Sequence, residues 1–491
     1  MTTDTLPEAA LAPYASAETI LAALHDGRLS ARTLMERTYD RIAAINPGLN
    51  AIISLRPRAE MLAEAEAADR ALALDRAAGR RPAALAGLPI AVKDLALTKG
   101  LRTTFGSPIF ADFIPGEDTL MVARLRAAGA LILGKTNTPV FGLGSHTTNA
   151  LHGPTQNSFL PGRSAGGSSG GAAVAVAAGL LPVADGSDYG GSLRNPAAWN
   201  NIFGLRPTQG RIPSVPSGDV FFGQMATDGP MAATIADLAL LLDVQSGPDP
   251  RAPLSRPPLP VRPALEDGPL RGLRVGWLGD LDGHLPTEAG ILETCATALD
   301  GARARGDIAL ADAALGFEPE ALWQAFVALR HFSVAPAITP LWEDPQKKPL
   351  LNAQQVWEYE GFLGLSGPQV SQAAAVRSAF FQRILALFED FDLLALPATQ
   401  LHPFPVDWAW PQQIAGREMD SYHRWMEVVV AGTMAGCPVL AAPAGFSGDA
   451  PVGLQFIARP DAEAQLLRFG LAWEAGLERP TGNRAGFAAQ L

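Results

Sequence analysis

Apolar positions recur along the chain with two spacings, one typical of helices and one typical of short buried strands. Residues 17–26, 31–45 and 59–78 have the spacing or composition of helices, and Ser30 stands where it can cap the second of them. Short, mainly apolar runs predict strands at residues 50–55, 88–92, 131–133, 182–184, 273–278, 393–396, 439–442 and 452–457. Because these strands alternate with helical segments such as residues 119–128, the pattern predicts an α/β fold.

The most distinctive stretch lies at residues 162–194, where two glycine–serine turns flank an alanine-rich apolar run. The first turn reads GGSSGG at residues 166–171, and the second reads DYGGS at residues 188–192. Glycine is favoured where the backbone takes a positive φ or closely approaches another group, and alanine is a strong helix former. We therefore expect residues 172–181 to form a buried helix that holds two serine-bearing loops in a fixed relation.

These turns, together with an upstream apolar strand, resemble the amidase signature family of serine hydrolases. The match runs strongly over residues 85–215 and more weakly toward the C-terminus. It departs from the family at Tyr189, where a small or aliphatic residue is more usual. The matching residues are GLPIAVKD at residues 87–94, GGSSGG at 166–171, GSD at 186–188, GGS at 190–192, Arg194, PAA at 196–198 and GLRPT at 204–208.

The resemblance implies a Ser–Ser–Lys catalytic triad made of Ser192, Ser168 and Lys93. Ser192 would attack the carbonyl carbon, Ser168 would bridge, and neutral Lys93 would accept the proton and later return it to the leaving amine. The family's bridging serine follows a cis peptide bond, so the bond between Gly167 and Ser168 should be cis. The oxyanion hole would be formed by backbone N–H groups of the second turn, namely Tyr189, Gly190, Gly191 and Ser192. No cofactor is needed for this chemistry.

The resemblance also implies the overall architecture. It predicts a central, mixed, twisted β-sheet with helices on both faces, in a single domain over residues 1–491. Within that domain we expect a helical N-terminal segment at residues 1–80, the signature core at 85–215, a variable substrate-side region at 250–380 and a C-terminal part at 390–491 that completes the sheet.

The distribution of lysine supports Lys93 as the base. The chain has only five lysines, and arginine supplies its other side-chain positive charges. The lysines are Lys93, Lys99, Lys135, Lys347 and Lys348. A GC-rich coding bias would produce the same scarcity, but arginine stays protonated whereas a buried lysine can lose its proton. Burial should therefore lower the pKa of Lys93. Lys135 is the best alternative, although we expect it to be structural.

Two other readings of the first loop are open. A phosphate-binding loop is disfavoured because no GK[ST] follows the glycines. Residues 166–170 also fit the GxSxG elbow of α/β-hydrolases, in which Ser168 would be the nucleophile with Asp392 and His402 as partners. That elbow needs a strand leading into it, and Pro-Gly-Arg at residues 161–163 stands there instead.

Metal catalysis is not indicated, because the histidines form no HExxH motif or similar cluster. His146 and His152 lie in the irregular stretch at residues 142–161 and could border the site, although packing roles are expected. The remaining histidines are His25, His284, His331, His402 and His423.

Asp188 and Arg194 flank the second turn, where we expect local hydrogen bonding and ion pairing.

Charge and cysteine content exclude several classes of function. The net charge of −11 and a pI of about 5.2 argue against a basic nucleic-acid-binding face. The two cysteines, Cys295 and Cys437, make no disulfide framework and should be buried thiols. The N-terminus lacks the basic and apolar regions of a signal peptide, and the uncharged runs contain glycine and proline. We expect a cytoplasmic protein with no membrane partner.

The substrate is expected to be a small amide. Aromatic residues and the lack of a carboxylate clamp favour neutral, apolar or aryl amides, with carbamates (urethanes) next because the same acyl-transfer chemistry cleaves them. The alternative is a glutamine-hydrolysing subunit of a tRNA-dependent amidotransferase. Acidic charge, Tyr189 and a divergent C-terminal half favour a free-standing monomer or homodimer. Candidate pocket residues are Phe332, Gln400, Trp408, Trp410 and Trp425.

Overall fold

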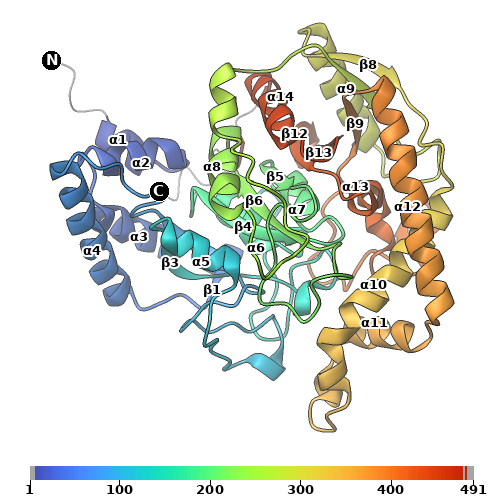
Figure 1. The fold of residues 1–491 in the computed structure, drawn as a ribbon, viewed down its shortest axis with the longest axis horizontal. Helices are drawn as coiled ribbons and strands as arrows, with labels where there is room; N and C mark the ends of the chain where they lie inside the picture. The colour runs from blue at the N-terminus through green and yellow to red at the C-terminus, as the bar shows by residue number, and fades with distance from the viewer. Residues whose placement is uncertain (1–5, 479–480, 484–491) are drawn as a thin grey trace.

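Eight strands form the main β-sheet, in the order β4-β6-β5-β12-β13-β9-β7-β8. Strands β8, β7 and β9 are parallel neighbours, and the other neighbouring strands pair antiparallel. The structure is a computed structural model that describes residues 6–478 and 481–483. The mixed sheet, with helices around it, confirms the expected α/β fold (Figure 1). The strands are β4 (Val183–Asp188), β5 (Phe203–Arg206), β6 (Thr227–Ala232), β7 (Leu273–Trp277), β8 (Ile308–Asp312), β9 (Leu393–Pro397), β12 (Val439–Ser447) and β13 (Ala450–Ala458).

The alternation of side chains along each strand gives this sheet two apolar faces. In β9, Leu393 and Ala395 belong to one buried core, whereas Leu394 and Leu396 belong to another. Helices therefore cover both faces, as expected. The first core includes residues of α8 (Ile235–Gln245), α9 (Ile291–Ala304) and α14 (Glu463–Ala475), and the second includes residues of α7 (Arg194–Trp199), α10 (Pro319–Trp342), α12 (Gly367–Asp390) and α13 (Val430–Ala435).

A second sheet of three strands carries the catalytic lysine candidate. Its order is β1-β3-β2, and β2 runs parallel to β3. Lys93 is the last residue of β2, and its backbone N–H donates to the carboxylate of Asp185 in β4, which joins the two sheets. The strands are β1 (Ile52–Ile53), β2 (Pro89–Lys93) and β3 (Leu131–Thr136).

The N-terminal part is helical, as expected. Its third helix runs through Pro47 rather than ending there, and it stops where Asn50 adopts a left-handed φ of 53°. The helices lie on one side of the molecule in Figure 1, beside the small sheet. They are α1 (Leu6–Leu11), α2 (Ala17–His25), α3 (Ala31–Leu49), α4 (Arg58–Ala77) and α5 (Leu120–Ala127).

The region between β8 and β9 is a group of helices at the opposite side of the molecule (Figure 1). Helix α11 (Ala353–Leu363) packs on α10, which also packs on α12. No helix among the described residues combines the length and apolar character that crossing a membrane requires. The remaining elements are α6 (Gly170–Ala177), β10 (Gln413–Ile414), β11 (Arg417–Glu418) and 3₁₀ segments at Pro108–Phe110, Val140–Gly142, Pro263–Asp267, Lys348–Leu350 and Arg424–Val429.

Candidate active site

The two serine loops meet at the ends of a helix and a strand that pack together. The first loop leads into α6, which is buried along its whole length, and the second joins β4 to α7. The backbone N–H of Ser169 donates to the carbonyl of Ser192 at 3.3 Å and ties the loops to each other. The peptide bond between Gly167 and Ser168 is cis, as expected.

Lys93 reaches this junction from β2. Its Nζ lies 2.8 Å from Ser168 Oγ, 2.8 Å from Ser169 Oγ and 2.9 Å from Ser187 Oγ. The carbonyl oxygen of Ser187 is 3.4 Å away. A neutral amine has two N–H donors and one lone pair, so one of the three hydroxyls must donate to the nitrogen when the proton is lost. Ser168 is one of the three hydroxyls placed to donate a proton to neutral Lys93.

The environment of Lys93 favours the neutral amine. The residue is 1% exposed, and this burial lowers the pKa of Lys93 to about 7, although Asp185 and Asp228 oppose the shift. A lysine that loses its proton near neutral pH can act as a general base. Ser169 and Ser187 were not among the expected site residues, yet each contacts Lys93 Nζ. Their positions in the sequence could have indicated them, because Ser169 follows Ser168 in the first serine turn and Ser187 directly precedes the second turn.

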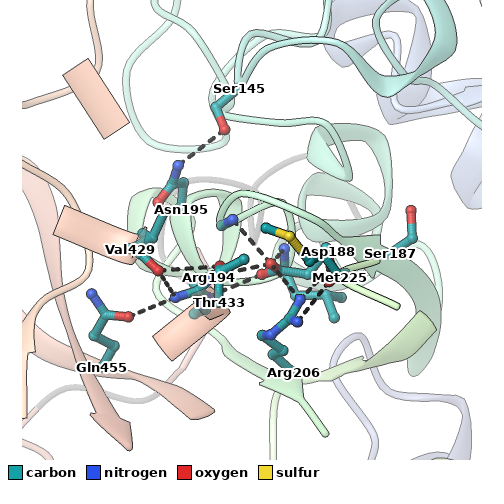
Figure 2. Close-up of polar contacts among 12 residues, drawn as sticks. Ser145, Ser187, Asp188, Arg194, Asn195, Arg206, Met225, Val429, Thr433 and Gln455 are labelled. Atoms are coloured by element: carbon teal, nitrogen blue, oxygen red, sulfur yellow. Dashed lines mark hydrogen bonds and ion pairs between the residues drawn. The ribbon is translucent and has the colours of Figure 1, made fainter. Parts of the chain in front are cut away.

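Ser192 stands in a turn that is fixed by a buried ion network. The carboxylate of Asp188 accepts the N–H groups of Gly191 and Leu193, at 3.0 and 3.1 Å. Figure 2 shows Asp188 between the guanidinium groups of Arg194 and Arg206, with the Ser187 side chain directed away from them. Burial acts to raise the pKa of Asp188, but these two arginines outweigh it and hold that pKa well below its usual range.

This network has a structural role, as expected for Asp188 and Arg194. The guanidinium of Arg194 donates to Asp188 with two nitrogens at 3.0 Å, and also to the carbonyl of Val429 and the side chains of Thr433 and Gln455 (Figure 2). It joins the turn to the C-terminal part of the chain. Because its donors are used in this way, Arg194 is not free to bind a substrate.

Of the four N–H groups expected to form an oxyanion hole, one is already used within the turn. The N–H of Gly191 is already bonded to Asp188, so it does not face a ligand. The N–H groups of Tyr189, Gly190 and Ser192 have no acceptor among the residues that the structure describes. Gly191 has a φ of +89°, a conformation that favours glycine and turns the chain into α7.

The approach stretch at residues 142–161 supports the first loop. Ser145 Oγ donates to the carbonyl of Gly167 at 2.8 Å, and Asn195 Nδ2 donates to Ser145 Oγ at 3.0 Å (Figure 2). His146 bonds to Ser164 Oγ and to the carbonyl of Val406, and burial lowers its pKa to about 4. It therefore has a packing role, as expected.

Tyr189 connects the second serine turn to α10. Its hydroxyl lies 2.7 Å from Ser333 Oγ, and the guanidinium carbon of Arg330 is 5.0 Å from the centre of its ring. Burial raises the pKa of Tyr189 to about 12, so its phenol is neutral. Arg330 in turn is paired with the buried carboxylate of Glu358 in α11. Tyr189 thus belongs to a buried polar network that it shares with side chains of α10 and α11.

The five expected pocket residues lie in different environments. Trp425 is 1% exposed and stacks on Trp199, with 5.8 Å between ring centres. Gln400 is fully buried and bonds the backbone of Pro286 and Val428, so both residues hold the fold together. The three others are partly or largely exposed: Phe332, Trp408 and Trp410.

The α/β-hydrolase alternative is wrong. Asp392 is paired with Arg274 at 2.9 Å, and His402 Nε2 lies 3.1 Å from the carbonyl of Ala289. Ser168 contacts Lys93 instead of a histidine. Lys135, the other lysine considered, is structural because its Nζ is bound to the carbonyl of Ala96 and to Thr98 Oγ1.

One group of side chains in the described part of the chain has the spacing of metal ligands: His284, Glu320 and Glu427. Arg424 pairs with both glutamates, at 2.5 and 3.0 Å, and supplies the positive charge that they need. None of these residues lies in the serine loops. The two cysteines are buried and free, as expected.

The chain resembles known proteins along nearly its whole length. It matches the Amidase family over residues 33–467. It is 36% identical over 501 residues to a glutamyl-tRNA(Gln) amidotransferase subunit of Thermus thermophilus, a match that covers 94% of this chain and 97% of the relative. It is 35% identical over 476 residues to an acylamidase of Rhodococcus erythropolis, with coverage of 94% and 95%.

Solved structures agree with these relatives. The structure of a bacterial aryl acylamidase of the amidase signature family superposes with a TM-score of 0.87 and 28% identity, covering 94% of this chain and 96% of that one. The match to the family model extends over most of the chain, and both relatives are more than 30% identical to it. The chain therefore belongs to the amidase signature family, as a hydrolase that acts on the C–N bonds of amides.

Proposed function

We propose that the protein is a free-standing serine amidohydrolase that cleaves small apolar or aryl amides through an acyl-enzyme on Ser192. The observation that carries this proposal is the 2.8 Å contact between Lys93 Nζ and Ser168 Oγ, in a loop tied to Ser192 by a backbone hydrogen bond. An amide needs an activated nucleophile, a stabilised oxyanion and a proton for the leaving nitrogen. The residues around Lys93 can supply all three.

In acylation, Ser192 Oγ attacks the carbonyl carbon of the amide. Its proton passes to Ser168 Oγ while the proton of Ser168 passes to Lys93 Nζ. The negative charge that forms on the carbonyl oxygen is stabilised by hydrogen bonds from N–H groups of the turn; those of Tyr189, Gly190 and Ser192 have no acceptor among the described residues. Lys93 then returns the proton through Ser168 to the leaving nitrogen, and the C–N bond breaks to release the amine.

Deacylation repeats the same steps with water as the nucleophile. Water gives its proton through Ser168 to Lys93 and adds to the acyl carbon. The tetrahedral intermediate collapses, and Ser192 Oγ leaves and regains the proton from Lys93 through Ser168. The acid is released and Lys93 is neutral again, so protons balance over the cycle. Glycine at positions 190 and 191 lets the acyl carbon approach the turn closely.

The substrate preference rests on the walls of the site. Phe332, Trp408 and Trp410 remain as candidate pocket residues, whereas Gln400 and Trp425 are left out because they are packed in the core. Phe332 lies in α10 and contacts Phe222, with 6.4 Å between ring centres. Aromatic walls bind flat apolar groups well. We therefore infer aryl amides first, and aryl carbamates second.

The second candidate is a glutamine-hydrolysing amidotransferase subunit, which the identity of 36% to such a subunit favours. A subunit of this kind should need partner chains and free glutamine. A free-standing enzyme should turn over an aryl amide alone and release little ammonia from glutamine. Ammonia release from glutamine by the isolated chain is therefore measured beside the aryl substrates.

The test of the proposed function is amine release from a short acyl anilide and the corresponding aryl carbamate. Ser192→Ala serves as the blank, and His402→Ala serves as a matched control because the proposed mechanism uses no histidine. We expect both substrates to be cleaved, the anilide faster, with activity lost in Ser192→Ala and kept in His402→Ala. Faster carbamate cleavage would assign a urethanase-like preference, and no amine from either substrate would contradict the aryl pocket.

A further inference from the structure

A cavity of about 190 Å³ reaches Lys93 from a side other than that of the bridging serine. Its wall includes Lys93 and Ser187, but neither Ser168 nor Ser192. Two carboxylates, those of Asp185 and Asp228, also line it. The serine relay has no use for these carboxylates, so their position beside the proposed base needs another explanation.

Strand pairing places both carboxylates on the same face of the sheet as Ser187. Strand β4 pairs antiparallel with β6, with Asp185 opposite Pro230 and Ser187 opposite Asp228. Residues opposite each other share a face, and so do residues two apart on one strand. Asp185 and Asp228 are therefore diagonal neighbours, with Cβ atoms roughly 7–8 Å apart or less. The pairing of β4 with β6 places Asp228 opposite Ser187, which contacts Lys93, and so brings Asp228 near the lysine.

The two carboxylates have different partners. Asp185 is 1% exposed, and its two oxygens accept the backbone N–H of Lys93 at 3.1 and 3.3 Å. The carboxylate of Asp228 has no hydrogen-bond partner among the described side chains and backbone groups. Thr119 Oγ1, which is buried, is likewise unpartnered, and Thr119 lines the cavity. A cavity of this size is large enough to hold water, and these two unpaired groups give that water polar partners.

We propose that Asp228, together with Asp185, is a positioning residue that sets the protonation of Lys93 by exchanging a proton with it through water in this cavity. The inference rests on the proposed function of Lys93 as the base. The carboxyl pair takes the excess proton of the lysine when the resting enzyme is protonated, and passes it to solvent. No proton is consumed, because each acyl transfer returns its own proton through Ser168.

The charges around the three groups agree with this exchange. Burial raises the pKa of Asp228 to about 7, with Asp185 adding to the rise, and burial raises the pKa of Asp185 to about 6. The pKa of Lys93 is lowered by burial to about 7. Three neighbouring groups that titrate in the same range share their protons. The fall of kcat/KM at low pH, here called the acid limb, therefore reports the titration of all three groups together.

The other charges that face Lys93 are few. Helix α6 contributes no charged side chain, and α3 buries an apolar face. Strand β3 contributes Lys135, which is bound to Ala96 and Thr98, and β4 contributes Asp188, which is neutralised by two arginines. Asp94, the residue after Lys93, accepts from Thr104. Asp228 is thus the carboxylate near Lys93 that has no fixed partner of its own among the described residues.

The test is the dependence of kcat/KM on pH for Asp228→Asn, with an aryl amide as substrate. The substitution removes a negative charge that stabilises protonated Lys93, so the pKa of Lys93 should fall. We expect the acid limb to move to lower pH by about one unit. Asp237→Asn is the matched control, because burial likewise raises the pKa of the Asp237 carboxyl, to about 6, but its partners are the N–H groups of Ala17 and Glu18. Its acid limb should coincide with that of the wild type.

A second variant keeps the inference testable if Asp228→Asn fails to fold. Asp185→Asn still offers an oxygen to the N–H of Lys93, and its acid limb should shift in the same direction. Asp228→Ala opens room for a small acid, so added formate should move its acid limb back toward the wild type. Acid limbs that stay in place in both asparagine variants would overturn the inference. High turnover in Lys93→Ala would instead contradict the proposed function, and the two failures are thereby told apart.

Discussion

The Nζ of Lys93 and the Oγ of Ser168 are 2.8 Å apart, and the two residues are only 1% and 2% exposed. A charged ammonium would lose hydration at this depth, and its hydrogen-bonding neighbours there are three hydroxyls and one carbonyl. The neutral amine loses less hydration and can accept a proton from Ser168. The same burial that orders the residues therefore favours the protonation state that the proposed relay needs.

Activity should depend on the neutral form of Lys93. Because burial lowers the pKa of Lys93 to about 7, kcat/KM should rise as the pH increases through about 7 and then level off. Lys93→Ala should lower kcat by about a hundredfold or more, as expected for removal of a general base. Steady-state rates over a pH series check both statements. A pH-independent wild-type profile, or a Lys93→Ala enzyme of wild-type rate, would contradict them.

Loss of Asp188 should destabilise the second serine turn, at residues 188–192. Asp188→Asn leaves Arg194 and Arg206 buried without their counter-charge, which costs about 3–5 kcal/mol of stability. Urea unfolding measures this, with Asp26→Asn as the control because the exposed pair of Asp26 with Arg28 should contribute about 0–1 kcal/mol. The depressed pKa of Asp188 adds a pH effect. The stability that Asp188 contributes is fully present above the ordinary carboxyl pKa, and it is lost as the pH falls from there through the lowered pKa of the folded state.

Two adjacent glycines of the turn should respond differently to alanine. At Gly191, a Cβ would lie 2.9 Å from Asn195 Oδ1 and from Val429, and the φ of +89° disfavours alanine. At Gly190, a Cβ would meet only Phe326, at an ordinary 3.4 Å. Gly191→Ala should therefore lose both activity and thermal stability, whereas Gly190→Ala should keep its melting temperature. Equal melting temperatures for the two variants would contradict this geometry.

The sequence predicted the strands and helices whose own residues form long apolar runs. The strand that ends at Lys93 and the buried helix after the first serine loop have strong apolar runs, and both were expected. Strands β5, β6 and β8 were not expected, because β5 has only four residues, β6 contains Gly229 and Pro230, and β8 is largely exposed at the edge of the sheet. Their strand conformation is set by pairing with neighbours that are distant in sequence.

The same reason explains which site residues the sequence did not indicate. Ser187 contacts Lys93, and Asp228 lies beside it, only because β2, β4 and β6 come together in the fold. Aromatic composition likewise could not separate Trp425, which is packed on Trp199, from the exposed Trp408. Side-chain type suggested a pocket, but burial is a property of the tertiary structure.

The pairing of Arg330 with Glu358 should control the substrate side of the site. Both residues are buried, and Glu358 also bonds the hydroxyl of Tyr422 and lies 2.9 Å from His331 Nδ1. Burial alone would raise the pKa of Glu358, but Arg330 and His331 outweigh it and lower that pKa to about 2. Glu358→Gln should therefore destabilise the protein by about 3–5 kcal/mol, because Arg330 would remain buried without a counter-charge.

The effect should extend to substrate binding through the ring of Tyr189, which lies under Arg330. Glu358→Gln should raise the KM for an aryl amide more than it lowers kcat, since the relay at Lys93 is unchanged. Tyr189→Phe is the matched control, because it removes the hydrogen bond to Ser333 and keeps the ring. Steady-state kinetics and urea unfolding of both variants measure the effect. A Glu358→Gln enzyme with wild-type KM and wild-type stability would show that this pair supports neither α10 nor the site.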